Sequence, residues 1–587
     1  MKFQRFSFYL SKLEATPSRN KITELFSSLL AEADAGEVDK ICYLSLGRLA
    51  PLYSGLEFNL AEKLLLKVLA RTFQKEETEV RKKYKEMGDM GDVVAFYKDS
   101  KKGKTLSVNE VYDRLYDLAN YTGEGSVERK IAAMSNLLTD LDSLSGKYVA
   151  RIPIGKLRLG FSELTILDAL SFLITGDKSK RSEIENAFNK RADIGQLAVL
   201  VKTQGLSSLK KIKVTLGIPL MPALAQRLPS ADEMIKKMGK VAVEPKFDGT
   251  RLQIHFSRKK TWRPDKTQLA FDFKPKGFVQ TFTRNLENTT NMFPDLVQII
   301  FKEIKADEVI LDSEAIGYNP KTGKFLPFQE TMQRKRKYSI KAKSKEIPLK
   351  FFCFDIMYKD GEDLISLPFT KRRESLERIL SSKNSSILLT PQIITDNPAV
   401  LRRYHDEQIK KGLEGVMVKK LDSPYEPGRR GYSWVKFKQE KTKKGGGLAD
   451  TLDCLVMGYN SGRGKRASFG IGGFLVGVKK SGSDEFVTLS KIGTGLSDEQ
   501  WRELRKRIDS VKVSSQPKEY LVNKNLFPDV WCSPQIVVEI QADNITKSPI
   551  HTALLALRFP RLVRFRDDKS PEEISTTAEV ENLFRLQ

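Results

Sequence analysis

Residues 244–251 read Glu-Pro-Lys-Phe-Asp-Gly-Thr-Arg and carry more structural information than any other part of this chain. The β-type run VAVEP leads into Lys246, Asp248-Gly249 is a common turn dipeptide, and the β pattern resumes from Arg251. We therefore expect a β-hairpin with Lys246 at the end of its first strand. A lysine amine is nucleophilic only when it is neutral, and a nearby cation such as Arg251 favours that form. Taken alone, such a segment is more often an ordinary turn with a solvated lysine.

Charged residues recur inside β-type runs further along the chain. Glu314 lies in LDSEAIGY and Glu414 in EGVMVKK, and carboxylates in such places are seldom buried unless they are paired or bound to a metal. In SWVKFKQ the two-residue period of a strand places Trp434, Lys436 and Lys438 on one face. Two neighbouring lysines repel each other unless they face an anion such as a triphosphate. A solvated edge strand with outward lysines is the alternative.

The net charge is large and unevenly distributed. The 587 residues carry a formal charge of +26, of which +7 falls in residues 1–215, +16 in 216–443 and +3 in 444–587. Such an excess raises the affinity for polyanions, most often nucleic acid. Solubility, or adaptation to a hot or salty niche, is the alternative explanation, and the charge alone does not decide between them.

The composition favours an intracellular protein. We find no apolar run near the roughly 20 residues that a membrane helix needs, and the N-terminal residues lack the pattern of a secretion signal. Cys42, Cys353, Cys454 and Cys532 lie far apart and form no CxxC pair. This spacing argues against a zinc ribbon or a disulfide framework.

The sequence pattern changes twice along the chain, whose length exceeds the roughly 100–200 residues of a usual domain. Residues 1–215 place apolar side chains at three- and four-residue spacing, as in NKITELFSSLLAEA, which predicts helices. Residues 216–443 contain β-type runs bounded by turn residues. Residues 444–587 hold short strands and one helical run, DEQWRELRKRID, which fits a small barrel. The lysine-rich segment around Gly445–Gly447 suits a hinge.

Taken together and in this order, these segments resemble the covalent nucleotidyltransferases, the superfamily of DNA ligases, RNA ligases and mRNA-capping enzymes. Residues 246–251 match the nucleophile motif KxDGxR, and residues 566–569 resemble the C-terminal RxDK motif. The other matching segments are Thr283–Asn288, Leu311–Glu314, Phe354–Ile356, Glu414–Val416 and Trp434–Lys438. So many motifs in the right order make a chance match implausible.

The resemblance covers nearly the whole chain and points to the archaeal and eukaryotic-type ATP-dependent DNA ligases. Residues 148–160, which we expect to be helical, look like part of the DNA-binding domain of those ligases. The NAD-dependent branch carries a four-cysteine zinc module, so the scattered cysteines favour ATP. Ser313 stands where glycine is usual and Asn285 where a second arginine is common, and neither departure removes a group that the chemistry needs.

The resemblance implies a multidomain fold. It consists of an all-α N-terminal DNA-binding domain over 1–215, an α+β nucleotidyltransferase (adenylation) domain over 216–443 and a C-terminal OB-fold β-barrel over 444–587. The implied function is ATP-dependent sealing of nicks in duplex DNA, through a lysyl-AMP on Lys246 and a DNA-adenylate, in replication, repair and recombination. An RNA-joining or capping nucleotidyltransferase and a non-catalytic DNA-binding scaffold are the alternatives.

The same resemblance implies roles for individual residues at an ATP site. Phe354 would stack on the adenine and Glu244 would read its amino group. Sugar and phosphate contacts would come from Arg251, Arg284, Arg430, Lys436 and Lys438. Glu314 and Glu414 would hold Mg²⁺, or Mn²⁺ in its place.

The C-terminal domain would take part in the first step only. Arg566 and Lys569 would orient the pyrophosphate, while the later steps need that space for DNA. The hinge at Gly445–Gly447 would let the barrel move between the two tasks.

The expected partner is nicked double-stranded DNA, bound by a monomeric cytoplasmic protein associated with the prokaryotic nucleoid. Residues 258–277 form a long loop between two predicted strands, and long loops are usually functional or disordered. The loop holds Gln268, Leu269, Phe271 and Phe273, which resemble a motif that docks bacterial replication proteins on a sliding clamp. The alternative is that its apolar side chains pack back on the neighbouring strands.

Overall fold

The computed structural model describes residues 1–16, 18–98, 103–159, 161–228, 230–260, 277–326, 328–334, 340–380, 385–438, 451–462 and 470–585. The predicted clamp-binding residues and the predicted hinge lie outside these ranges. The chain divides into two compact units, Met1–Lys438 and Gln439–Gln587. Within the described ranges, the search for a helix long and apolar enough to cross a membrane finds none.

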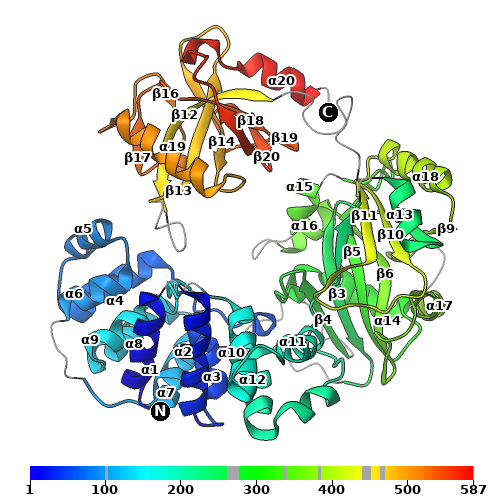
Figure 1. The fold of residues 1–587 in the computed structure, drawn as a ribbon, viewed down its shortest axis with the longest axis horizontal. Helices are drawn as coiled ribbons and strands as arrows, with labels where there is room; N and C mark the ends of the chain where they lie inside the picture. The colour runs from blue at the N-terminus through cyan, green and yellow to red at the C-terminus, as the bar shows by residue number, and fades with distance from the viewer. Residues whose placement is uncertain are drawn as a thin grey trace. The chain divides into compact units, whose positions relative to one another are not determined.

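The N-terminal part of the first unit is helical, as predicted (Figure 1). Its helices are α1 (Phe3–Ala15), α2 (Arg19–Glu32), α3 (Val38–Ser45), α4 (Glu62–Phe73), α5 (Glu77–Met87), α6 (Met90–Tyr97), α7 (Val108–Asn120), α8 (Ser126–Asp140), α9 (Ser143–Arg151), α10 (Glu163–Thr175), α11 (Arg181–Lys190) and α12 (Ile194–Gln204). The predicted helix over residues 148–160 is wrong beyond Arg151. Ile152 keeps helical backbone angles, but Pro153 has no N–H to continue the helical hydrogen bonds, and Gly155 and Arg158 have left-handed φ values of 61° and 60°.

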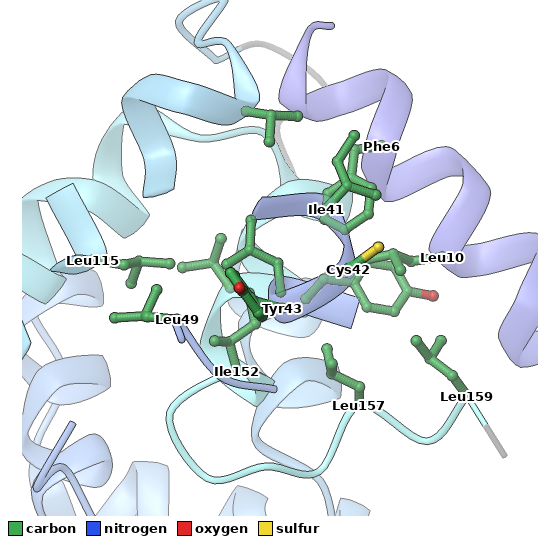
Figure 2. Packing of buried hydrophobic residues seen from close by; sticks show 14 of the residues in the cluster. Phe6, Leu10, Ile41, Cys42, Tyr43, Leu49, Leu115, Ile152, Leu157 and Leu159 are labelled. Atoms are coloured by element: carbon green, nitrogen blue, oxygen red, sulfur yellow. The ribbon is translucent and has the colours of Figure 1, made fainter. Parts of the chain in front are cut away.

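The helical part is built around α3, whose Ile41 and Cys42 have no exposed surface. Figure 2 shows side chains of α1, α7 and the segment after α9 gathered around them. Phe6, Leu10 and Leu115 are among these side chains, and all three are fully buried. The amphipathic period of each helix therefore directs one apolar stripe into a common core.

A five-stranded sheet carries the segment that leads to Lys246. Its strand order is β1–β11–β10–β2–β9. The strands are β1 (Leu224–Arg227), β2 (Val241–Pro245), β9 (Ile393–Thr395), β10 (Gly415–Lys420) and β11 (Arg430–Lys438). Alternate valines of β2 and β10 pack against α13 (Ala231–Met238) and α18 (Pro398–Lys410) on one face. Strand alternation consequently turns Glu244, Met417 and Lys419 to the opposite, inner face.

A second sheet has the order β4–β3–β5–β6–β7, with β8 beside β6. Its strands are β3 (Thr250–Ser257), β4 (Phe278–Thr283), β5 (Glu308–Gly317), β6 (Leu349–Lys359), β7 (Glu362–Asp363) and β8 (Ile387–Leu389). One face packs against α14 (Pro294–Glu303) and α17 (Phe369–Ile379), and the short helices α15 (Phe328–Met332) and α16 (Ile340–Glu346) lie between β5 and β6 in the chain. The inner face pairs Arg251 with Glu314 and Gln253 with Asp312.

The predicted hairpin around Lys246 is wrong, because β2 and β3 belong to different sheets. β2 pairs with β9 and β10, whereas β3 pairs with β4 and β5. Residues 246–249 therefore cross from one sheet to the other. Gly249 permits the crossing, since a Cβ atom there would lie 2.3 Å from the carbonyl oxygen of Ala315. Long-range strand pairing decides the path here, and the Asp-Gly dipeptide reports only that the chain bends.

A third core joins the inner faces of the two sheets to residues 214–223, which follow the helical part. The backbone N–H of Gly217 donates to Nδ1 of His255 at 3.0 Å. The side-chain amide of Gln253 accepts from the N–H of Leu220 at 3.0 Å and donates to its carbonyl oxygen at 2.7 Å. These contacts fix the segment across the inner face of β3.

The second unit is mainly β-sheet, which confirms the predicted OB-like C-terminal fold. Its main sheet follows the order β15–β17–β12–β13–β14–β16, and β18 pairs with β12 and β21. The strands are β12 (Leu452–Ser461), β13 (Ile471–Lys479), β14 (Phe486–Ile492), β15 (Lys512–Val513), β16 (Tyr520–Leu521), β17 (Val530–Cys532), β18 (Val537–Gln541), β19 (Asn544–Lys547), β20 (Leu555–Arg558) and β21 (Arg561–Phe565). The predicted helix is α19 (Asp498–Ser510), and α20 (Thr577–Arg585) adds a helix that the sequence pattern did not predict.

Candidate active site

Lys246 stands where the chain leaves the first sheet, and its ammonium group forms an ion pair with Glu414. The backbone fixes both residues, because the N–H of Lys246 donates to the carbonyl oxygen of Gly415 at 2.9 Å and the N–H of Glu414 donates to that of Lys246 at 3.1 Å. The two side chains are 23% and 21% exposed. The sequence pattern predicted Glu414 inside a strand. That prediction is wrong, because Glu414 lies one residue before β10 begins. The lysine is thus held rigidly and remains accessible.

Glu314 on β5 is the second carboxylate of this site. Burial raises the pKa of its carboxyl to about 8, the Lys246 and Arg251 cations oppose the rise, and the Asp312 and Glu414 carboxylates add to it. Mutual repulsion of this kind shows that Glu314 and Glu414 act on one region of space. The site therefore places two carboxyl groups beside the candidate nucleophile, and a bound cation would favour the ionised form of Glu314.

Two carboxylates are enough to hold Mg²⁺ where the substrate supplies further ligands. Mg²⁺ usually binds one or two protein carboxylates and completes its coordination with waters and substrate phosphates. Among the residues that the structure describes, no three His, Cys, Asp or Glu side chains gather as a closed metal cage. The carboxylates of Glu314 and Glu414 therefore suit a Mg²⁺ ion that binds together with a nucleotide.

Arg251 is tied to the second sheet by a bidentate ion pair with Asp312. Its Nε and Nη2 donate to the two carboxylate oxygens at 2.9 and 2.6 Å, and Nη1 donates to the carbonyl oxygen of Ala223 at 2.8 Å. The hydroxyl of Tyr425 also donates to Asp312, at 2.7 Å. Asp312 and Tyr425 raise the pKa of the Arg251 guanidinium against the effect of burial. Most donors of Arg251 are therefore committed within the protein.

Glu244 lies on the inner face of β2 and is only 1% exposed. Its Oε2 accepts from Nζ of Lys419 at 2.7 Å, and its Oε1 lies 3.5 Å from Nη1 of Arg373. Neither Lys419 nor Arg373 was among the residues predicted for the site. The strand period in EGVMVKK does place Lys419 on the inner face, which is the signal that identifies it.

Phe354 occupies a β-bulge between β5 and β6, where Asp312 pairs with Asp355 and Ser313 with Cys353. A bulge leaves its extra residue unpaired and redirects the side chain. The Phe354 ring is half-buried, and its centroid lies 5.9 Å from that of Trp434 across the two sheets. The predicted stacking residue thus reaches the region between the inner faces.

The other residues predicted to contact the nucleotide are more widely spread than Lys246, Glu314 and Glu414. Lys436 pairs with Met417 across β10 and β11, so it shares the inner face with Trp434 and is half-buried. The side chain of Lys438 lies outside the described part of the chain. Arg284 follows β4 and Arg430 begins β11, and both are exposed.

In the second unit, Arg566 and Lys569 converge on Asp453. Nη1 of Arg566 donates to Oδ1 of Asp453 at 2.9 Å, and Nζ of Lys569 donates to Oδ2 at 2.7 Å. Asp568 holds the other side of the guanidinium through two hydrogen bonds of 2.8 Å. Asp453 was not predicted from the sequence, because its partners lie more than a hundred residues later in the chain.

Comparison with known proteins identifies the class that this fold and site represent. Three family models match the chain. "DNA ligase N terminus" matches residues 2–171, "ATP dependent DNA ligase domain" matches residues 270–438, and "ATP dependent DNA ligase C terminal region" matches residues 467–569. The chain belongs to the ATP-dependent DNA ligases.

Full-length relatives support this membership. The "Probable DNA ligase" of Dictyoglomus thermophilum is 44% identical over 595 residues, which cover 100% of this chain and 98% of the relative. The "DNA ligase" of Acidianus ambivalens is 37% identical over 612 residues, with the same coverage of 100% and 98%. The solved structure named "Pmar-Lig_Pre" is 18% identical and covers 96% of this chain and 99% of its own, with a TM-score of 0.55, and it supports the fold alone.

Proposed function

We propose that this ligase seals nicks in duplex DNA through a lysyl-AMP on Lys246 and then a DNA-adenylate, in replication, repair and recombination. The observation that carries the proposal is the crossover between the sheets, which holds Lys246 against Glu414 and beside Glu314. A solvated turn lysine would have no reason to meet two partly buried carboxylates. The same arrangement makes the alternative hypothesis, a non-catalytic DNA-binding scaffold, less favoured.

In the first step, the neutral amine of Lys246 attacks the α-phosphorus of ATP. An N–P bond forms, the bond from that phosphorus to the pyrophosphate oxygen breaks, and pyrophosphate leaves with the electron pair. Glu414 is the carboxylate in contact with the ammonium group, so it is placed to accept the proton that the amine must lose. Glu314 and Glu414 would hold Mg²⁺, which when bound neutralises phosphate charge.

In the second step, a 5′-phosphate oxygen at the nick attacks the AMP phosphorus and Lys246 leaves. In the third, the 3′-hydroxyl attacks the activated 5′-phosphate, the phosphodiester forms and AMP departs. All three steps are in-line displacements at phosphorus, for which positioning and charge stabilisation supply most of the catalysis.

The remaining assignments belong to the same proposal. Phe354 stacks on the adenine, Glu244 faces its amino group and Lys436 meets the α-phosphate. Arg251, Arg284, Arg430 and Lys438 contact sugar and phosphate, and Arg566 with Lys569 orients the pyrophosphate. The three domains extend over 1–215, 216–443 and 444–587, and the sliding-clamp contact of residues 268–273 is kept as a separate hypothesis.

Incubation with α-labelled ATP and Mg²⁺, followed by a denaturing gel, tests the first step. The wild type should retain the label, Lys246→Ala should not, and the control variant Lys240→Ala, at an exposed lysine before β2, should. Parallel assays on nicked DNA and nicked RNA duplexes separate a DNA ligase from an RNA-joining enzyme. Label on Lys246→Ala, or faster sealing of RNA, would contradict the proposal.

A further inference from the structure

Lys419 is a buried cation on the inner face of β10, and the proposed mechanism assigns it no role. Its side chain is 1% exposed. The ammonium nitrogen lies 2.7 Å from Oε2 of Glu244 and donates to the carbonyl oxygen of Phe354, also at 2.7 Å. It thus connects the two residues proposed to meet the adenine.

Three aromatic rings enclose the same ammonium group. Nζ of Lys419 lies 4.5 Å from the ring centroid of Trp434, 4.7 Å from that of Phe369 and 5.0 Å from that of Phe354. Aromatic faces stabilise a desolvated cation and offer it no proton acceptor. The Lys419 ammonium group is therefore enclosed by these three rings and the Glu244 carboxylate.

The charge on Lys419 opposes the effect of burial on the Glu244 carboxyl. Burial raises the pKa of the Glu244 carboxyl, and the Lys419 and Arg373 cations oppose that rise. Lys419 is the nearer cation, at 2.7 Å against 3.5 Å for Arg373. Without Lys419, the low-dielectric surroundings would favour the neutral acid, which carries an O–H donor.

An ionised carboxylate and a neutral acid recognise different purines. Adenine presents an amino donor at position 6, and guanine presents a carbonyl acceptor there. Oε2 of Glu244 accepts from Lys419 at 2.7 Å, whereas Oε1 accepts a longer hydrogen bond of 3.5 Å from Arg373, so we assign the less tightly held Oε1 to the base. Met417, directly opposite Glu244 in the sheet, and Phe354, whose carbonyl oxygen accepts from Lys419, are both half-buried.

We propose that Lys419 is a specificity-determining residue, which holds Glu244 as an acceptor-only carboxylate and thereby selects ATP over GTP. The inference rests on the proposed function, since it places adenine beside Glu244 and Phe354. A buried acceptor that meets another acceptor is left unpaired, and sites built in this way discriminate strongly.

The test compares labelling of each variant by α-labelled ATP and by α-labelled GTP under single-turnover conditions. Lys419→Met should raise the GTP-to-ATP rate ratio by about tenfold or more, because it removes the charge and keeps the length. Lys419→Arg, which keeps the charge, should leave the ratio near that of the wild type. Lys420→Met is the matched control, since Lys420 is the next residue on the strand, points to the other face and is 45% exposed.

The ratio is insensitive to partial unfolding, because unfolded molecules react with neither nucleotide. Lys419→Gln, which keeps a hydrogen-bond donor, should shift the ratio in the same direction and serves if Lys419→Met is too unstable to purify. An unchanged ratio in the charge-removing variants, or equal loss with both nucleotides, would overturn the inference. Failure of the wild type to be labelled by ATP would instead overturn the proposed function.

Discussion

His255 is fully buried on the inner face of β3, and its imidazole is neutral there. Burial, with a smaller contribution from Lys260, lowers the pKa of the ring from 6.5 to about 3. Nδ1 accepts the hydrogen bond from Gly217, and a protonated ring could not do so. Protonation of His255 would therefore break a hydrogen bond that attaches residues 214–223 to β3.

The sign of this dependence follows from proton uptake. Below pH 6.5 the unfolded chain binds a proton at His255 that the folded chain binds only near pH 3, so stability falls as the pH drops through that window. Between pH 7 and pH 5 we expect His255 to reduce the free energy of unfolding by about 2 kcal/mol. Urea unfolding at the two pH values, for the wild type and His255→Gln, measures this difference. Equal losses in both proteins would contradict it.

Single residues differ in how far the sequence could assign them. The sequence singles out Lys246, Glu314 and Glu414 because each lies in a short motif; the structure brings them near one another, and their roles stay a prediction. The partners of Arg251 and Glu244 could not be assigned in the same way. Asp312 reaches Arg251 through the pairing of β3 with β5, and Lys419 reaches Glu244 through the pairing of β2 with β10, between residues far apart in the chain.

At the scale of elements, the crossover at residues 246–249 sets the position of Lys246, the proposed nucleophile. Gly249→Ala should misplace it, because the added Cβ atom would lie 2.3 Å from the backbone oxygen of Ala315. A displacement of about 1 Å at a reacting group costs roughly a hundredfold in rate, and we expect that loss in adenylation. The control is Gly36→Ala, where the added Cβ atom meets no heavy atom within 4 Å. Rapid-quench adenylation assays give both rates, and similar rates in the two variants would refute this role of the crossover.

The loop after β21 gives a second prediction at this scale. Asp453 holds Arg566 and Lys569 together, so Asp453→Asn should disorder both cations. Because charge-assisted hydrogen bonds are stronger than neutral ones, we expect enzyme adenylation to slow by about tenfold. Sealing of a pre-adenylated nick should be nearly unaffected, as it should be for Arg566→Ala. Single-turnover assays of the two steps compare them, and equal losses would assign the loop another role.

Elements with a clear period were predictable, and the connections between them were not. The apolar spacing in residues 126–140 predicts a helix because one face must be buried whatever the neighbours are. The turn at Asp248-Gly249 looked like a hairpin, since local statistics do not register that β10 and β5 pair with its two flanks. The break after α9 came from Pro153, which the helical interpretation of residues 148–160 overlooked.

For the whole molecule, the net charge of +26 predicts how the ligase holds DNA. Contacts to phosphate release counterions, so affinity for a nick should fall by about a hundredfold or more between 50 and 200 mM salt. Adenylation by ATP without DNA should change far less over the same range. Fluorescence anisotropy with a nicked duplex measures the first quantity and label retention the second. A flat anisotropy series would exclude phosphate-dominated binding.

The family was predictable from the sequence because ordered motifs survive over the whole chain, and the comparisons confirm it. The limits of the three domains stay a prediction, as do the hinge and the clamp contact, which fall outside the described residues. Motifs report the chemistry that a fold must carry out, whereas linkers and loop tips leave no comparable pattern in a single sequence.

The central claim is that the AMP intermediate is formed on Lys246. Peptide mapping by mass spectrometry, after incubation of the wild-type chain with ATP and Mg²⁺ and digestion under non-acidic conditions, tests it most directly. We expect one AMP adduct, located on Lys246 in the peptide that contains residues 241–251, and its loss on addition of nicked DNA. An adduct on another lysine, or one that persists in the presence of a sealable nick, would contradict the mechanism.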